Sequence, residues 1–179
     1  MNDTTIIDTG RSVAPVEKLL TLEGDVHRQI RATYRGAKAE DRDTILDLLK
    51  EMHEEVSIYT MNEDKIIDKI DTIINNGVCF LAVVDDEVVG SLGCEPSQTW
   101  YSDDVFLGER WTFVKEDYRR STIAKDLLNI ADDFSTKMDM ILVIGVFSPK
   151  RTAGKNALFR RVFKPMGEFF VGGKCDVLR

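Results

Sequence analysis

Apolar residues recur with a helical period in two early segments of the chain. Between Ile45 and Met52 they fall three or four positions apart, behind an acidic segment over residues 40–43, which is typical of a helix start. The same period runs over Glu63–Asn75 and stops before Gly77, a common residue after a helix end. Two amphipathic helices are therefore predicted in the first half of the chain.

Other segments carry apolar runs or alternations that predict β-strands. We expect Ile30–Ala37 to form the first strand. The runs Val78–Val84 and Val88–Cys94 flank a short polar turn at residues 85–87, which indicates a hairpin. Further strands are expected over Val105–Val114 and Met140–Phe147, and glycines at positions 167, 172 and 173 mark out two last strands.

The segment 105–134 predicts a strand, a sharp polar turn and a long helix in succession. By strict alternation, Glu109 shares one face of the strand with Leu107, Trp111 and Phe113. The helix that follows from Ile123 has one apolar face aimed at a core. A turn of this kind directs the unpaired N–H groups at the helix start toward whatever lies above them, and phosphate is their natural ligand.

The loop in this segment runs from Val114 through Arg119 and Thr122 to Ala124. It resembles the pyrophosphate loop of the GNAT N-acetyltransferases, whose pattern is an apolar strand end, then Arg or Gln, two residues, Gly, one residue, and Gly or Ala. Arg119 and Ala124 match that pattern, whereas Thr122 replaces the first glycine. A threonine is tolerable there only if its φ stays negative.

A second resemblance to the family lies in a short helix expected over Lys155–Phe163. GNAT members often show Asn, six residues, Tyr, three residues and Gly, and Asn156, Phe163 and Gly167 stand at that spacing. The element order β-α-α-β-β-β-α-β-α-β-β also matches over about Ile30–Val177. The resemblance implies an α+β fold, with a mixed, mostly antiparallel central sheet of about seven strands and four helices in a three-layer α/β/α sandwich.

The resemblance also implies that the chain binds acetyl-CoA (coenzyme A). The expected contacts come from the strand end, the loop, the start of the central helix and the later helix: Phe113, Val114, Arg119, Arg120, Ser121, Thr122, Ile123, Ala124, Asn156, Phe159 and Phe163. Two structural alternatives stay open. The loop is also readable as a plain turn with a Ser-Thr helix cap, and Asn156 as an ordinary first-turn residue.

Phe163 stands where many family members carry a tyrosine that protonates the leaving thiolate. A phenyl ring cannot donate a proton. We therefore expect the proton to come from Tyr118, Tyr59, Tyr101 or water. The alternative is that no residue fills this role.

Glu109 is our preferred general base, because an apolar surround would raise the pKa of its carboxyl toward the working pH. The alternative is a solvated glutamate at a strand start. Glu95, His53 and Glu55 are substitutes for the same role. In this family, the connection that carries His53, Glu55 and Tyr59 forms one wall of the acceptor pocket. The histidines show no metal-ligand spacing with any cysteine, so no metal site is predicted.

The predicted function is transfer of an acetyl group from acetyl-CoA to a primary amine of a small molecule, a modified base or a protein. Acidic loop residues, namely Glu54, Glu55, Asp103 and Asp104, would attract a cationic acceptor. The alternative is a catalytically weak or inactive GNAT-like module that docks on a partner through its N-terminal segment. Thr122 and Phe163, which depart from the family pattern, motivate that alternative.

Length and local composition divide the chain into two parts. Residues 1–29 form an N-terminal arm with a short helix expected over Val16–Leu22, and residues 30–179 form the acyltransferase domain. We expect the arm to be held by the domain or by a partner. That partner could be a second copy of the chain, in a homodimer or a larger assembly.

The net charge of −7 is unevenly distributed along the chain. Residues 150–179 carry +6, so the remainder carries −13. The acidic remainder argues against general nucleic-acid binding. The basic segment suits one compact polyanion such as coenzyme A, and a solvated charged face is the alternative. No apolar run is long enough to span a bilayer, and three cysteines are too few for a disulfide framework. We expect a cytoplasmic protein. The loop is also similar to that of small members encoded by tailed phages, which would place it in the host cytoplasm.

Overall fold

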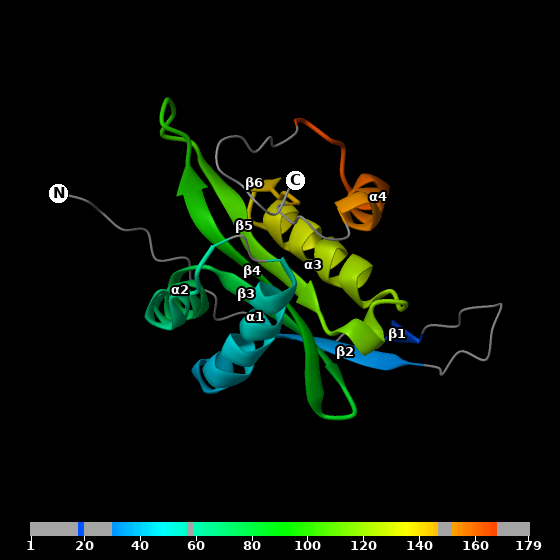
Figure 1. Cartoon of the computed structure of the whole chain (residues 1–179). Coiled ribbons are helices and arrows are strands. Elements are labelled where there is room, and N and C mark those ends of the chain that lie inside the picture. The colour runs from blue at the N-terminus through cyan, green and yellow to red at the C-terminus, as the bar shows by residue number, and fades with distance from the viewer. Residues whose placement is uncertain (1–17, 20–29, 57–58, 147–151, 168–179) are drawn as a thin grey trace.

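The computed structural model describes residues 18–19, 30–56, 59–146 and 152–167 of the chain (Figure 1). Its strands and α-helices are, in order, β1 (Lys18–Leu19), β2 (Arg31–Gly36), α1 (Arg42–Val56), α2 (Glu63–Asn76), β3 (Val78–Val84), β4 (Glu87–Gln98), β5 (Val105–Val114), α3 (Ile123–Lys137), β6 (Ile141–Val143) and α4 (Thr152–Val162). Short 3₁₀ turns over Ala39–Asp41 and Glu116–Tyr118 precede α1 and α3.

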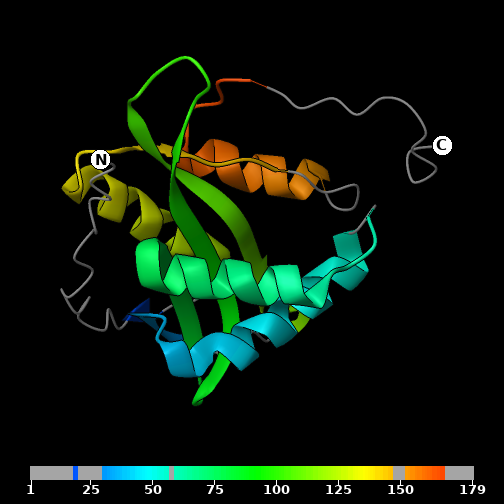
Figure 2. The ribbon, with the colours of Figure 1, turned by 90° about the vertical axis from the view of Figure 1, so that its left-hand side faces the viewer.

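The six described strands form one sheet in the order β1-β2-β3-β4-β5-β6. Neighbours are antiparallel except β5 and β6, which are parallel. Helices α1 and α2 cover one face, and α3 and α4 cover the other (Figure 1, Figure 2). The predicted α+β, three-layer architecture is confirmed. The sheet has six described strands rather than about seven, and the two strands expected near the C-terminus fall outside the described residues.

Each face of the sheet has its own apolar core. The α1/α2-side cluster consists of Ile45, Leu46, Leu49, Ile70, Ile73, Cys79, Leu81 and Trp111. The α3-side cluster consists of Ala32, Tyr34, Phe80, Ala82, Val84, Val89, Leu92, Cys94, Leu107, Val114, Ile123, Leu127, Leu128 and Ala131. Burying these two apolar surfaces on opposite faces of one sheet is the main stabilising contribution in a domain of this size.

The predicted hairpin between β3 and β4 is confirmed, with a two-residue turn at Asp85 and Asp86. Both residues have positive φ, 49° and 64°. Two consecutive left-handed residues are typical of a type I′ turn, whose twist matches that of the flanking strands. Aspartate visits this conformation more readily than most residues because its short side chain can bond locally.

The N-terminal segment contributes a strand where a short helix was expected. Lys18 and Leu19 pair antiparallel with Ala32 and Arg31 of β2, so the helix predicted over Val16–Leu22 is wrong at these two positions. The rest of that segment lies outside the described residues. Within the part of the chain that the structure describes, no helix is both long and apolar enough to cross a membrane.

A β-bulge in β5 overturns the predicted alternation of that strand. Glu109 pairs with Cys94, but Trp111 pairs with Gly93, so β5 has one extra residue, Arg110, between these two pairs. Leu107 consequently lies in the α3-side cluster, whereas Trp111 lies in the α1/α2-side cluster. Glu109 therefore does not share a face with Trp111.

Gly93 allows the Trp111 ring to lie against the backbone of β4. A Cβ on Gly93 would come within 2.4 Å of the ring, which is far closer than atoms can approach. We expect Gly93→Ala to lower the free energy of unfolding by about 1–3 kcal/mol, measured by urea denaturation, because the ring must shift. Gly36→Ala is the matched control, since a Cβ there meets nothing within 4 Å. Equal stability of the two variants would contradict this account.

Candidate active site

Strands β5 and β6 separate after a short stretch of parallel pairing. Only Phe106–Gly108 pair with Ile141–Val143, and β5 then continues to Val114 with no described strand beside it on that edge. A cavity of about 820 Å³ opens there. It is lined by the end of α1, the start of α2, β5, Gly145 and Val146, the start of α3, and α4.

Glu109 lines this cavity on β5. Its carboxylate accepts a hydrogen bond from Thr112 Oγ1 at 3.1 Å and another from the backbone N–H of Gly145, across the gap between the strands. Burial raises the pKa of Glu109 to about 7, although these hydrogen bonds and the charges of Lys155 and Arg110 act to lower it. A carboxylate with a pKa near neutrality is suited to accept a proton.

The start of α3 is organised by the hydroxyl groups of Ser121 and Thr122. Ser121 Oγ donates to the carbonyl of Tyr118 and accepts the N–H of Ile123 at 3.2 Å. Thr122 has φ −87°, which meets the condition set for a threonine at the family's glycine position. Its Oγ1 donates to Asp126 Oδ2 at 2.6 Å.

Asp126 connects this loop to the opposite side of the α3-side cluster. Its Oδ2 also accepts a hydrogen bond from Tyr34 Oη of β2 at 3.0 Å, and both residues are buried. Burial, followed by the charge and hydrogen bond of Asp126, raises the pKa of Tyr34 above its usual range. Tyr34 therefore remains a donor, and the loop before α3 is tied to β2.

Two amides at the start of α3, those of Ala124 and Lys125, have no acceptor within the described residues. Ile123 N–H is satisfied by Ser121, and Asp126 N–H bonds to the carbonyl of Thr122. The N–H groups of Ala124 and Lys125 bond to none of the residues that the structure describes, and both residues line the cavity. The start of an α-helix carries a partial positive charge, so the chemistry of these amides at the cavity wall suits an anion.

Arg119 joins the two sides of the cavity. Its Nε donates to the carbonyl of Val114 at 2.7 Å, and its Nη2 donates to Glu55 Oε1 of α1 at 2.6 Å. The guanidinium lies over the Phe113 ring, 5.2 Å from its centroid, at a distance where a cation and a ring attract each other. Its Nη1 is buried and has no partner among the described residues.

The acceptor-side wall comes from the end of α1 and the start of α2. His53, Glu55 and Tyr59 all line the cavity, as expected. His53 Nε2 lies 3.0 Å from the carbonyl oxygen of Tyr59, and the Tyr59 side chain is 71% exposed. Glu55 is engaged by Arg119, so it is not open to bind a cationic acceptor.

Helix α4 supplies the remaining wall. Phe159 lines the cavity as expected. Asn156 is exposed on α4 and lies outside the lining, and Phe163 packs against the α3-side cluster, with its ring edge-on to Phe159 at 6.4 Å. The structure thus gives Asn156 and Phe163 no contact with the cavity.

Other predicted site residues also lie away from the cavity. Tyr118 packs against the α3-side cluster, Ile123 is fully buried in it, and the Arg120 side chain is exposed. Glu95 lies on the α1/α2 side. Burial would raise the pKa of Glu95, but hydrogen bonds from Lys69 and Arg110 outweigh burial and lower it. A carboxylate held ionised in this way is a poor proton acceptor, so the structure does not support Glu95 as the base.

Several cavity residues were missed at the level of sequence. Lys155 and Leu158 share one face of α4 with the predicted Phe159, and Lys65 and Lys125 come from the first turns of α2 and α3. The remaining missed lining residues are Met52, Thr60, Met61, Asn62, Ile66, Arg110, Trp111, Thr112, Gly145, Val146, Gly154 and Arg161. Only the i, i+3, i+4 spacing in α4 was a usable signal, because a lone surface lysine has no pattern of its own.

Comparisons with known proteins agree with this geometry. Residues 42–161 match the model of the Acetyltransferase (GNAT) family. No curated protein matches the sequence significantly. Among solved structures, the aminoglycoside N-acetyltransferase AAC(6')-Iy in complex with CoA is similar with a TM-score of 0.62 and 18% identity, over 84% of this chain and 100% of that chain.

Two further structures share the fold. A predicted acetyltransferase from Clostridium acetobutylicum with acetyl-CoA has a TM-score of 0.64 and 10% identity, over 79% of this chain and 96% of that chain. A ribosomal-protein-alanine N-acetyltransferase from Brucella melitensis biovar Abortus 2308 has a TM-score of 0.61 and 14% identity, over 79% and 99%. The parted sheet and the helix start beside it define an acyltransferase fold. The chain belongs to the GNAT acetyltransferase family, because the family model spans more than half of its length.

The raised pKa of Glu109 predicts how stability depends on pH. The folded-state pKa, about 7, lies above the ordinary value of 4.5, so this carboxyl lowers the stability of the fold as pH rises from about 4.5 through 7. Glu109→Gln removes the titration. We expect the difference in unfolding free energy, variant minus wild type, to be about 1–3 kcal/mol more favourable to the variant at pH 8 than at pH 5. Urea denaturation at both pH values measures this gain, and an unchanged difference would contradict the assignment.

Proposed function

We propose that this chain transfers an acetyl group from acetyl-CoA to a primary amine, with Glu109 as the general base. The observation that carries the proposal is the cavity between the parted strands. A carboxylate with a pKa near 7 faces the same cavity as the unpaired amides at the start of α3. These are the two elements that amine deprotonation and phosphate binding require.

The residues at the cavity fit the phosphate groups of coenzyme A. The N–H groups of Ala124 and Lys125, together with the Lys125 side chain and Arg119, would hold the diphosphate. Lys155 and Arg161 of α4 line the same cavity and add positive charge. Two of the similar structures named above were solved with CoA or acetyl-CoA. When bound, acetyl-CoA supplies an activated thioester carbonyl.

Glu109 would take the proton from the incoming amine. Because its pKa is about 7, the carboxylate is ionised at slightly alkaline pH and is a stronger base than a solvated glutamate. On the same strand, a backbone N–H near Phe113 or Val114 would polarise the thioester carbonyl. Holding both reactants in one cavity can supply on the order of 7–11 kcal/mol of the acceleration.

Among the tyrosines considered for protonating the thiolate, Tyr59 is placed best. It lines the cavity, whereas Tyr118 packs against the α3-side cluster. Tyr101 is 73% exposed on the loop between β4 and β5, edge-on to Trp100. We propose that Tyr59 or water fills this role.

The charge of the cavity narrows the acceptor. Six of the lining side chains are lysine or arginine, and two are acidic. Of the six cations, Lys65 and Arg110 are the two not assigned above to coenzyme A. Of the four acidic loop residues expected to attract a cation, only Glu55 lines the cavity, and it is paired with Arg119. We therefore propose an acceptor with a single amine, such as a peptide N-terminus or an amino-acid-like molecule, rather than a polycation. Cytoplasmic location and assembly through the N-terminal segment stay predictions of the sequence.

The base assignment predicts the effect of Glu109→Gln on turnover. Wild-type protein is first assayed with acetyl-CoA and, in turn, a peptide amine, a polyamine and an aminoglycoside. The amine that produces release of the CoA thiol is the acceptor. We expect the variant to lower kcat by about 10²–10⁴-fold and to leave acetyl-CoA binding intact. The kcat of wild type should rise with pH through about 7. Unchanged turnover would remove Glu109 from the mechanism, and preference for the polyamine would contradict the proposed acceptor.

Acetyl-CoA binding at the start of α3 is tested by Ala124→Glu. A carboxylate at this wall would repel the diphosphate and fill its space, so we expect the thermal shift produced by acetyl-CoA to disappear. In wild type, a concentration of one hundred times Kd should add about 2.7 kcal/mol of stability. Ala153→Glu is the matched control, because Ala153 is exposed on α4 outside the lining. The absence of any shift in wild type would favour a module without activity.

A further inference from the structure

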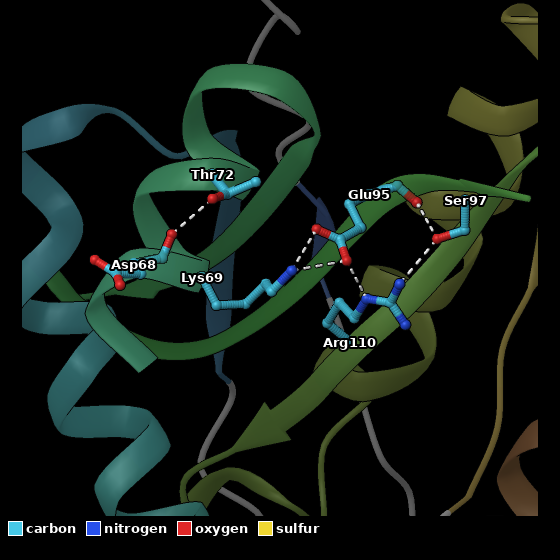
Figure 3. A network of polar contacts seen from close by, with 6 residues as sticks. All are labelled: Asp68, Lys69, Thr72, Glu95, Ser97 and Arg110. Atoms are coloured by element: carbon cyan, nitrogen blue, oxygen red, sulfur yellow. Dashed lines mark hydrogen bonds and ion pairs between the residues drawn. The ribbon is translucent and has the colours of Figure 1, made fainter. Parts of the chain in front are cut away.

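A network of ion pairs lies on the α1/α2 face of the sheet (Figure 3). One of its members, Arg110, also lines the cavity that Glu109 faces. The Glu95 carboxylate of β4 accepts two hydrogen bonds from Lys69 Nζ of α2, at 3.0 and 2.9 Å, and one from Arg110 Nε of β5. Arg110 Nη2 also donates to Ser97 Oγ at 2.9 Å. Arg110 is thereby held at two points of its guanidinium by two residues of β4.

Arg110 is the extra residue of the β5 bulge, and it directly follows Glu109. The bulge places Arg110 and Trp111 on the same face of the sheet although they are consecutive. Trp111 is held on that face by burial and by a hydrogen bond from its Nε1 to Ser91 Oγ at 3.1 Å. Both residues after Glu109 are therefore fixed to the α1/α2 side.

We propose that Arg110 and Glu95 are positioning residues, which hold the bulge so that Glu109 points into the gap between β5 and β6. The inference rests on the proposed function, in which Glu109 is the base. Regular alternation would put residues 109 and 111 on one face, and a shift of one residue moves a strand's side chains to the opposite face. The Arg110 tether selects the bulged arrangement over the regular one.

The exposure of the network supports a positioning role over a purely stabilising one. The Lys69 and Arg110 side chains are 44% and 41% exposed, whereas the Glu95 side chain is 11% exposed. Ion pairs with solvent-exposed partners contribute little net stability. The buried Glu95 carboxylate would need one cation to offset its desolvation, and Lys69 already supplies it with two hydrogen bonds. The second cation, Arg110, is left to fix the geometry of β5.

Arg110→Lys is the sharpest variant, because it keeps the positive charge. A lysine cannot donate to Glu95 and Ser97 with the fixed fork of a guanidinium. The readout is the titration of the Glu109 carboxyl, followed by NMR of carboxyl carbons in ¹³C-glutamate-labelled protein and assigned with Glu109→Gln. This measurement needs no acceptor or cofactor.

We expect Glu109 to titrate near pH 7 in wild type and at least one pH unit lower, toward its ordinary 4.5, in Arg110→Lys, because the carboxyl leaves its buried position. Ser97→Ala is a second, charge-neutral variant and should move the titration in the same direction. Thr72→Val is the matched control. It removes a hydrogen bond from Thr72 Oγ1 to the carbonyl of Asp68 on the exposed side of α2 and should leave the titration unchanged (Figure 3).

The outcomes separate the two proposals. If Glu109 titrates near 7 in wild type and also in Arg110→Lys and Ser97→Ala, the positioning role is overturned and the base assignment stands. If Glu109 titrates near 4.5 in wild type, the base assignment itself fails. If Thr72→Val shifts the titration as much as Arg110→Lys, the effect is a general loosening of the fold, which also overturns the positioning role.

Discussion

The separation of two parallel strands is the constraint on which the rest of this structure depends. β5 and β6 share three residue pairs, and beyond them the edge of β5 faces a cavity, with no strand of the described residues beside it. An exposed strand edge inside a protein leaves polar groups to be satisfied by other means. On the other side of the gap, the chain after β6 presents the backbone N–H of Gly145, and this group bonds to the Glu109 carboxylate. The gap therefore creates the space for a ligand and also the surroundings that set the chemistry of its main carboxyl.

Two glutamates on adjacent strands have pKa values shifted in opposite directions, because they lie on opposite faces of one sheet. Glu109 faces the gap and is dominated by desolvation, so its pKa rises to about 7. Glu95 faces α2, where Lys69 and Arg110 outweigh burial and lower its pKa. Burial favours the neutral form of a carboxyl, and nearby cations favour the charged form. The bulge at Arg110 assigns the two residues to these different surroundings.

Much of the fold was predictable because its elements have regular periods. The spans of α2, β3 and β5 and the polar turn at Asp85 and Asp86 followed from local pattern alone. Glu109 was predicted as a base for a partly wrong reason, since strict alternation would place it on the same face as Trp111, and the bulge does not. A bulge depends on the partner strand and on distant side chains such as Glu95, and a single-strand pattern carries no information about either.

The chemistry of the site was less predictable than its location. Ala124 and Arg119 lie at the cavity, as the loop pattern indicated, but Asn156 and Phe163 do not, although their spacing fits. Spacing along a helix sets which residues share a face, and the rotation of that face depends on packing against the rest of the molecule.

The hydrogen bonds of Thr122 have a consequence for how this sequence can change over time. Its hydroxyl and that of Tyr34 both donate to Asp126 Oδ2. A glycine at position 122 would add backbone freedom but remove one donor from the buried Asp126 carboxylate. Positions 122 and 126 are thus coupled, and their substitutions should covary: descendants with glycine at 122 should also replace the aspartate.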